Sequence, residues 1–427
     1  MRPVAGGSRL SPRAAPAPIA PMGGVLVVLV VTLLTAGQPI ATDLYLAALP
    51  SIRSEYGAPV SVVQLTLSLV VLSFGLSQLL WGPAADRFGR RPVAIAGFAL
   101  YTAGALMGAL APTIDVLIAS RVAQGAGVAA CTVCGRAMVR DLFEPAQGTH
   151  VMASAMTALA SLTMLVPVVG ALLATHLGWR ATLLAMTIFG TAMLLLVVLR
   201  VPETVRALDG QAMRPASLLR GYGLISRHRG FQAWTLLSSA GYSAAFGFLS
   251  GSAYLFIDTF GVSRLVFGAV IGSASVAYMI GTILCRRWMR QIGLLHAVRR
   301  AGALSLVSAA VFILPQLIWV HTPLTLSIAL WISFLAYGVH QPCGHVGIAA
   351  SFPERAGAAS ALGGFVLAAA AFLCGTWLGA MFIAGSAAVL SYTTGVLVGA
   401  TGLCAVTLVQ RHGQPRAAPQ ALPTTVP

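Results

Sequence analysis

Hydrophobic residues occur in twelve long runs along the chain, separated by short polar segments. An α-helix needs about 20 apolar residues to cross a bilayer, and every run reaches that length. The pattern therefore predicts an all-α membrane protein with twelve transmembrane helices. The predicted spans are Met22–Pro50, Val60–Gly82, Val93–Pro112, Val116–Val139, Val151–Thr175, Ala181–Arg200, Phe231–Phe256, Leu265–Leu284, Ala301–Val320, Leu324–Ala349, Ala358–Phe382 and Ala387–Val409.

The predicted spans fall into two groups of equal length. Residues 22–200 contain the first six spans and residues 231–409 the last six, and the longest loop, 201–230, joins them. Equal halves indicate a duplicated six-helix unit, an arrangement typical of transporters. The terminal segments 1–21 and 410–427 are rich in Pro, Ala and Gly, and we predict that both are disordered.

The arginines predict how the chain lies in the membrane. All 26 basic residues are arginines. With a cytoplasmic N-terminus, 22 of them lie on the cytoplasmic side, and only Arg53, Arg180 and Arg264 lie on the other. This asymmetry follows the positive-inside rule. It predicts a multi-pass membrane protein with both termini and the loop 201–230 in the cytoplasm.

The composition excludes several classes of protein. Hydrophobic residues make up 58% of the 427 residues and charged residues 8%, whereas a soluble domain carries about 25% charged residues. A soluble enzyme, a disordered chain and a nucleic-acid-binding protein are therefore excluded. Topology accounts for the net charge of +16. The 10 acidic residues are too few and too scattered for a membrane enzyme. We expect no metal and no cofactor.

A glycine- and arginine-rich loop lies between the second and third spans. It reads Gly82-Pro83-Ala84-Ala85-Asp86-Arg87-Phe88-Gly89-Arg90-Arg91. Glycines permit sharp turns and close backbone contacts, and Asp86 can meet an arginine or a helix N-terminus. The loop resembles the signature loop of the major facilitator superfamily, whose fold has twelve helices in two halves. The resemblance implies a gating role for Gly82, Asp86, Arg87, Gly89, Arg90 and Arg91.

Further motifs resemble the Bcr/CflA drug:proton antiporter subfamily. They are Asp43–Pro50, Arg121–Gly127, Arg136–Asp141, Pro167–Gly170, Gly178–Arg180, Val201–Thr204 and Phe352–Gly357. Pro167 and Gly170 match the antiporter motif of the fifth span. The sequence departs from that subfamily at Ala47, where proline is usual, and at Val166 and Ala171, where the motif has glycines.

Two charged residues lie well inside the predicted bilayer, Asp43 in the first span and Arg121 in the fourth. Each lies about 8 to 10 Å from the outer end of its span at 1.5 Å per residue, so their depths are similar. A lone charge at that depth is costly, and we expect the two to pair or to share a wet cavity. They are candidates for proton coupling, and the alternative is a purely structural ion pair.

Polar residues share one side of the first span. Gln38, Thr42 and Tyr45 lie on one arc of the helix, with Asp43 at its edge. They predict one wall of a substrate cavity, to which we add Gln124, Tyr242 and His340. For all six, hydrogen bonding or packing between neighbouring helices is the alternative interpretation.

The residues and the resemblance together predict a proton-coupled exporter of small amphipathic compounds or antibiotics. It would be a monomer in a bacterial inner membrane and would work by alternating access. Its partners would be protons, a small-molecule substrate and the lipid bilayer. Asp43 would carry the proton, and Arg121 and Gln124 would tune it. The alternative is an exporter or importer of one metabolite, such as a sugar, nucleoside or amino acid.

Overall fold

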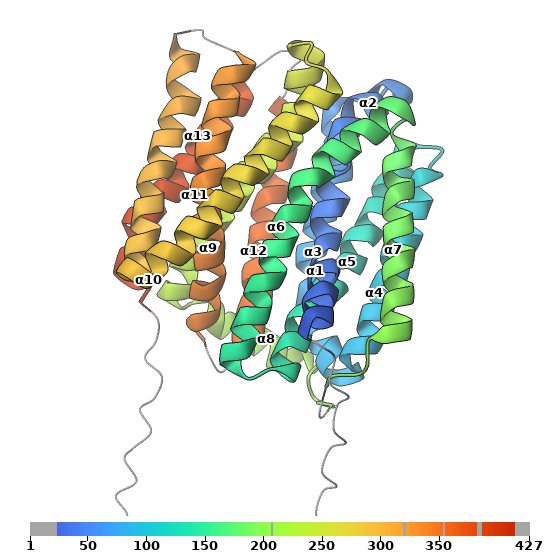
Figure 1. Ribbon diagram of the computed structural model, residues 1–427, viewed down its shortest axis with the longest axis vertical. Helices are drawn as coiled ribbons and strands as arrows, with labels where there is room; N and C mark the ends of the chain where they lie inside the picture. Colours follow the sequence, from blue (N-terminus) through green and yellow to red (C-terminus); the bar gives the residue numbers. More distant parts are fainter. Residues whose placement is uncertain (1–23, 206–207, 319–321, 353–354, 382–386, 415–427) are drawn as a thin grey trace, which may run out of the picture.

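The protein folds into a bundle of long helices, seen in Figure 1. The computed structural model describes residues 24–205, 208–318, 322–352, 355–381 and 387–414, and contains no strand within these ranges. The elements are α1 (Gly24–Asp43), η1 (Leu46–Ala48), α2 (Leu49–Tyr56), α3 (Val60–Phe88), α4 (Arg90–Ala109), α5 (Ile114–Leu142), α6 (Pro145–His176), α7 (Arg180–Arg200), α8 (Pro215–Ser226), α9 (Arg229–Ala253), η2 (Tyr254–Thr259), α10 (Arg264–Leu317), α11 (Pro323–Ala350), α12 (Ala356–Met381), α13 (Ala387–Val406) and α14 (Leu408–His412).

The described helices confirm the two-half, twelve-span layout. Ten of them are long and apolar enough to cross a membrane. One of these, α10, has 54 residues and accounts for two predicted spans, because its helical path breaks at Gly293, where φ is +78°. The seventh span, α9, is not among the ten. It is rich in Ser and Gly, and most of its side chains are buried by other helices.

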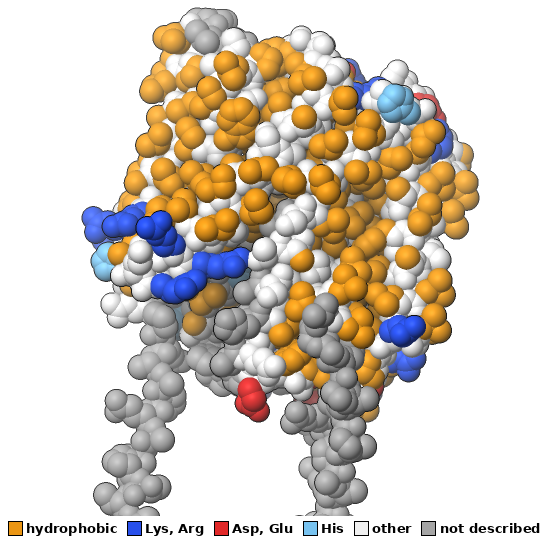
Figure 2. All heavy atoms as spheres, in the orientation of Figure 1, with side chains coloured by type: hydrophobic (Ala, Val, Ile, Leu, Met, Phe, Trp, Pro, Cys, Tyr) orange, Lys and Arg blue, Asp and Glu red, His pale blue; other side chains and the backbone are white. Residues whose placement is uncertain are grey.

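Two ends of the bundle need names. The α8 end is the end where α1 begins and α8 lies, and the α2 end is opposite (Figure 1). In Figure 2 a broad band of hydrophobic side chains covers the visible surface, and most of the charged side chains lie above or below its middle. A belt of this kind suits the hydrocarbon region of a bilayer.

The structure corrects three expected boundaries. The span Met22–Pro50 is not one helix, because α1 ends at Asp43 and the chain continues as η1 and α2. The loop 201–230 contains the helix α8, and residues 410–412 are helical as the end of α14. The segments 1–23 and 415–427 lie outside the described residues, as does nearly all of both predicted tails.

The last two turns of α1 contain two residues that perturb helical hydrogen bonding. Pro39 lies inside the helix and lacks the amide hydrogen that an interior turn uses. The Thr42 hydroxyl lies 3.2 Å from the Gln38 carbonyl oxygen, so it can bond to the backbone of its own helix. A side chain that bonds to its own helix in this way often bends it.

The two halves meet along two seams lined by small residues, α3 against α12 and α6 against α10. A Cβ atom built on Gly75 of α3 would lie 2.2 Å from the Ala368 Cβ of α12. On α10, a Cβ on Gly272 would lie 2.8 Å from the Met164 carbonyl oxygen of α6. Small residues let membrane helices approach closely, where dispersion forces hold them together.

The hydrophobic core is shared at one end of the bundle and divided at the other. One large cluster includes the η1–α2 segment of the first half and residues of η2, such as Phe256, from the second half. Towards the α8 end the buried clusters stay within one half. Phe98 belongs to a cluster of the first half, and Trp234 to a cluster of the second. The buried apolar core is therefore shared at the α2 end and divided between the halves at the α8 end, where a hydrogen bond from Arg286 of α10 to the Thr157 hydroxyl of α6 still joins them.

Candidate transport site

Asp43 occupies the last position of α1, where the helix breaks. Its carboxylate is half-buried and accepts a hydrogen bond from the Thr42 hydroxyl at 2.8 Å. The side chain lies within electrostatic reach of Tyr242 on α9. On the previous turn, the Gln38 side-chain amide donates to the Tyr242 hydroxyl at 3.3 Å. The predicted polar face of the first span therefore meets the second half of the chain at Tyr242.

Arg121 is fully buried on α5 within the first half. Its guanidinium donates to the Ala41 carbonyl oxygen of α1 and to the Thr66 carbonyl oxygen of α3, the latter at 3.1 Å. It also bonds to the Gln124 side chain, and its Cζ lies 4.3 Å from the centre of the Tyr45 ring. Arg121 thus ties three helices together where α1 ends.

Of the two arrangements expected for Asp43 and Arg121, an ion pair or a shared cavity, the ion pair is not formed. No ion pair joins them in the described part of the chain, where the arginine's bonds go to carbonyl oxygens and Gln124. Tyr45, which lies in the turn beyond the end of α1, contacts Arg121. Asp43 lies within electrostatic reach of Tyr242 of the second half instead. Equal depth in the membrane therefore does not place Asp43 beside Arg121.

Three of the predicted cavity residues serve contacts between helices in this structure. Tyr45 is buried, and its hydroxyl lies 3.1 Å from the Thr66 hydroxyl. Gln124 is buried between Arg121 and the Met186 sulfur. His340 is buried on α11, with its Nε2 atom 3.1 Å from the Ser305 hydroxyl of α10. These three fit the alternative interpretation given above. Gln38 and Tyr242 form a contact between the halves, and Thr42 bonds to its own helix and to Asp43.

Phe246 and Tyr337 of the second half lie near Tyr242, and sequence reasoning missed both. The Phe246 ring stacks against Tyr242, with centroids 6.4 Å apart and planes inclined at 27°. Tyr337 of α11 packs against Tyr278 of α10 at 5.8 Å, and the Tyr278 hydroxyl bonds to Gln341. Phe334, Tyr337 and Gln341 recur every three to four residues along α11. That spacing marks one helix face and could have identified them from the sequence.

The signature loop forms a charged network at the α8 end of the first half. Arg90 is buried between the carboxylates of Asp86, at 2.6 Å, and Asp141 on α5, at 3.0 Å. Glu203, just beyond α7, accepts hydrogen bonds from the backbone amides of Arg90 and Arg91 at 2.9 and 3.1 Å. These amides begin α4, so the carboxylate caps the positive end of that helix. Of the two partners that the sequence allows for Asp86, an arginine or a helix N-terminus, the structure shows an arginine, Arg90.

Other members of the signature loop have different surroundings. Arg87 is exposed and lies beside the Phe88 ring, with its Cζ 5.3 Å from the centroid. A Cβ atom built on Gly82 would have no atom within 4 Å. Gly89 has a φ of +102°, and a Cβ there would lie 2.4 Å from Glu203 Oε2. Only the second glycine of the motif is therefore required by its local geometry in this structure.

The fifth-span motif lies where three helices meet. A Cβ atom on Gly170 of α6 would lie only 2.3 Å from the Leu44 carbonyl oxygen, directly after Asp43. On the other side of α6, a Cβ on Gly268 of α10 would lie 3.0 Å from the Pro167 carbonyl oxygen and 2.8 Å from Ala171 Cβ. Although Ala171 replaces a glycine of the motif, Gly268 supplies the space from the opposite helix.

Polar contacts connect the halves at the α2 end. Arg264 at the start of α10 donates to the Ser51 hydroxyl of α2 at 2.6 Å and to the Ala174 carbonyl oxygen of α6 at 3.3 Å. Arg53 of α2 lies 3.9 Å from Asp258 of η2. By contrast, Arg180 bonds to Glu55 inside the first half. The contacts of Arg264 and Arg53 add to the shared apolar core that closes this end.

The sequence profile described as Major Facilitator Superfamily matches residues 31–373, which is most of the chain. The chain belongs to the major facilitator superfamily. The members of this superfamily are membrane transporters. Within the described residues, no group of three or more His, Cys, Asp or Glu side chains could hold a metal ion.

Several members of the superfamily are similar to this chain along most of their length. An uncharacterized MFS-type transporter, YdgK, of Bacillus subtilis is 29% identical over 334 residues, which cover 77% of this chain and 82% of that protein. Multidrug resistance protein D of Escherichia coli is 27% identical over 339 residues (79% and 84%). A bicyclomycin resistance protein homolog of Haemophilus influenzae is 24% identical over 378 residues (87% and 93%). These similarities confirm the resemblance to the Bcr/CflA subfamily.

A solved structure of the superfamily shares the fold. The partially occluded inward-open conformation of the Escherichia coli xylose transporter XylE has a TM-score of 0.69 and 16% sequence identity. The similarity covers 91% of this chain and 97% of that one.

Proposed function

We propose that this superfamily member is a proton-driven exporter of small amphipathic compounds, with the α8 end in the cytoplasm. The orientation is supported by the arginines, because Arg87, Arg90 and Arg91 lie at the α8 end and Arg53 and Arg264 at the α2 end. The exporter assignment is supported by the names of the relatives, two of which are called resistance proteins.

Asp43 carries the proton in this proposal. The observation behind it is that this carboxylate lies half-buried at membrane depth with no positive partner among the described side chains. Protonation removes its charge, and burial favours the neutral form. Because Asp43 lies beside the Gln38–Tyr242 contact between the halves, a change in its charge acts where they must move. Arg121 is a positioning residue that holds the last turn of α1 through the Ala41 carbonyl.

The substrate lies between the halves, against the aromatic side chains of α9, α10 and α11. Tyr242, Phe246 and Tyr337 offer flat apolar faces and hydroxyl groups to one molecule. Such faces suit amphipathic compounds with an aromatic ring or a single positive charge. A bound cation would favour the charged form of Asp43, and proton binding would weaken cation binding. That competition is the basis of exchange.

The divided apolar core at the α8 end supports an inward-facing state in which the Arg286–Thr157 hydrogen bond still joins the halves at that end. In that state the substrate enters from the cytoplasm, while the Arg264–Ser51 contact and the common core keep the α2 end closed. Alternating access then requires these contacts to open as the halves close at the α8 end. The Asp86–Arg90–Asp141 network keeps the cytoplasmic end of the first half rigid during this movement.

A drug-susceptibility panel in a bacterial strain without its own exporters tests the function. The wild type should raise resistance to amphipathic compounds, and Asp43→Asn should abolish it. Asp115→Asn is the matched control, because Asp115 is exposed in the first turn of α5. Membrane insertion is checked by immunoblot. Transport in everted vesicles, with metabolites and drugs in parallel, completes the test. Transport of one metabolite and of no drug would contradict the proposal, as would full resistance in Asp43→Asn.

A further inference from the structure

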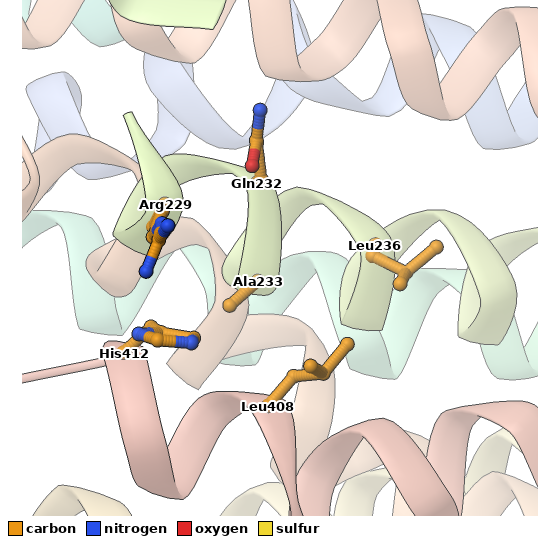
Figure 3. Close-up of a pocket in the computed structure, with 6 residues that line it drawn as sticks. All are labelled: Arg229, Gln232, Ala233, Leu236, Leu408 and His412. Carbon is orange, nitrogen blue, oxygen red and sulfur yellow. The ribbon is translucent and has the colours of Figure 1, made fainter. Parts of the chain in front are cut away.

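A pocket of ≈ 300 Å³ opens at the α8 end of the second half, between the start of α9 and α14 (Figure 3). Its lining residues are Arg229, Gln232, Ala233, Leu236, Leu408 and His412. Figure 3 shows the nitrogen-bearing ends of Arg229 and His412 close together at one side and the two leucines at the other, with Ala233 between them. The pocket thus has a basic end and an apolar end.

The basic end and the apolar end lie at different depths. Arg229 is the first residue of α9, and Leu236 follows seven residues later, about 10 Å along the helix. Leu236 is 52% exposed and Leu408 37% exposed, both outside the packed core. The pocket therefore runs from a basic site at the membrane boundary to an apolar surface at membrane depth. This is the profile of an amphiphile with a polar head and a hydrocarbon chain.

The Arg229 and His412 side chains have no polar partner in the part of the chain that the structure describes. Within the described residues, neither the Arg229 guanidinium nor the His412 ring makes a hydrogen bond or an ion pair. None of the six lining residues is acidic. The surrounding frame is nevertheless fixed. The Trp234 indole donates to the Gly413 carbonyl oxygen at 3.1 Å, and the Gln410 side chain donates to the Leu295 carbonyl oxygen at 3.0 Å.

We propose that this pocket binds an anionic phospholipid, with its phosphate between Arg229 and His412 and an acyl chain along Leu236 and Leu408. A phosphodiester accepts charge-assisted hydrogen bonds from both side chains. Basic pockets at the cytoplasmic ends of membrane helices suit anionic headgroups, and an arginine near the membrane surface contributes about 1 kcal/mol. Only the choice of leaflet rests on the orientation given under Proposed function. The binding itself does not depend on transport.

The test measures lipid binding to the purified full-length protein by native mass spectrometry. The probes are phosphatidylglycerol, zwitterionic phosphatidylethanolamine and soluble glycerol 3-phosphate. The double variant Arg229→Gln/His412→Gln is compared with Arg220→Gln/His296→Gln, which removes an exposed arginine and histidine elsewhere at the α8 end. We expect the Kd for phosphatidylglycerol to rise about tenfold in the first variant and to stay unchanged in the second. Phosphatidylethanolamine should bind more weakly to the wild type.

Three results would overturn the proposal. The first is an equal loss of phosphatidylglycerol binding in both double variants, which would show that only net charge matters. The second is displacement of the lipid by an equal concentration of glycerol 3-phosphate, which would show a site for a free anion. The third concerns Leu236→Ser, which tests the contact with the acyl chain and leaves Arg229 and His412 unchanged. This variant replaces the double variant if the latter does not fold. It should weaken phosphatidylglycerol binding, and unchanged binding would refute the acyl contact.

Discussion

Replacement by alanine should lower the stability of the protein at only one of the two glycines of the signature loop. Gly89 has a backbone conformation, φ +102° and ψ 157°, that is almost restricted to glycine. Its alanine variant would also place a methyl group 2.4 Å from Glu203 Oε2. Gly82 lies within α3, and the position of its added methyl group is empty. The motif alone gives no reason to treat the two positions differently.

The magnitudes follow from these surroundings. The strained conformation at Gly89 costs about 1–3 kcal/mol for a residue with a side chain. The displaced Glu203 carboxylate would lose its hydrogen bonds to the Arg90 and Arg91 amides, at about 1 kcal/mol each. Gly89→Ala should therefore destabilise the protein by about 3–5 kcal/mol. In Gly82→Ala the helix preference of alanine gains about 0.5–1 kcal/mol, and steric conflict with Pro83 offsets part of that gain.

Purified protein in detergent is heated to a series of temperatures, and the amount of folded protein that remains is measured by size-exclusion chromatography. Gly89→Ala should lower the apparent Tm by several degrees, whereas Gly82→Ala should leave it near the wild-type value. Glu203→Gln provides an independent check, because it weakens the same helix cap without changing the backbone. Equal losses of stability in the two glycine variants would refute the local reasoning, and so would an unchanged Tm in Gly89→Ala.

Three further variants test other parts of the structure. Arg264→Gln should open the α2 end more often, so that a cysteine placed at buried Ala48 reacts faster with a membrane-impermeant maleimide. Arg180→Gln should not have this effect, because the Arg180–Glu55 contact lies within one half. Arg121→Lys should lower thermal stability, because one ammonium group cannot replace the planar fork that reaches carbonyls of two helices, and a wild-type melting curve would contradict this. Tyr337→Ala should raise the Kd of an aromatic cation about threefold to tenfold in fluorescence titrations, and an unchanged Kd would remove Tyr337 from the site.

The lengths of the hydrophobic runs predicted the transmembrane spans well, because the thickness of a bilayer fixes the length of an apolar helix. Even the 54-residue helix α10 was divided correctly, with Gly293 between its two predicted spans. The break after Asp43 was missed, although Pro39 and Thr42 lie just before it. Their effect depends on hydrogen bonds that hydropathy does not describe.

The site was harder to predict, because depth is one coordinate and rotation about the helix axis is another. Asp43 and Arg121 were placed at similar depth, but contacts between α1, α5 and α9 decide what each one faces. Arg121 is held largely by carbonyl oxygens, and any residue type can offer a carbonyl. Asp141 and Glu203 were both within quoted motifs, but only folding brings them to Arg90.

The most direct test of the proposed mechanism separates substrate movement from proton coupling at Asp43. Proteoliposomes containing either the wild type or Asp43→Asn are assayed with one exported compound, first for accumulation driven by a pH gradient and then for exchange of labelled against unlabelled substrate without a gradient. The account predicts that Asp43→Asn loses gradient-driven accumulation and retains exchange. Undiminished accumulation driven by the pH gradient in Asp43→Asn would contradict the assignment of Asp43 as the proton carrier.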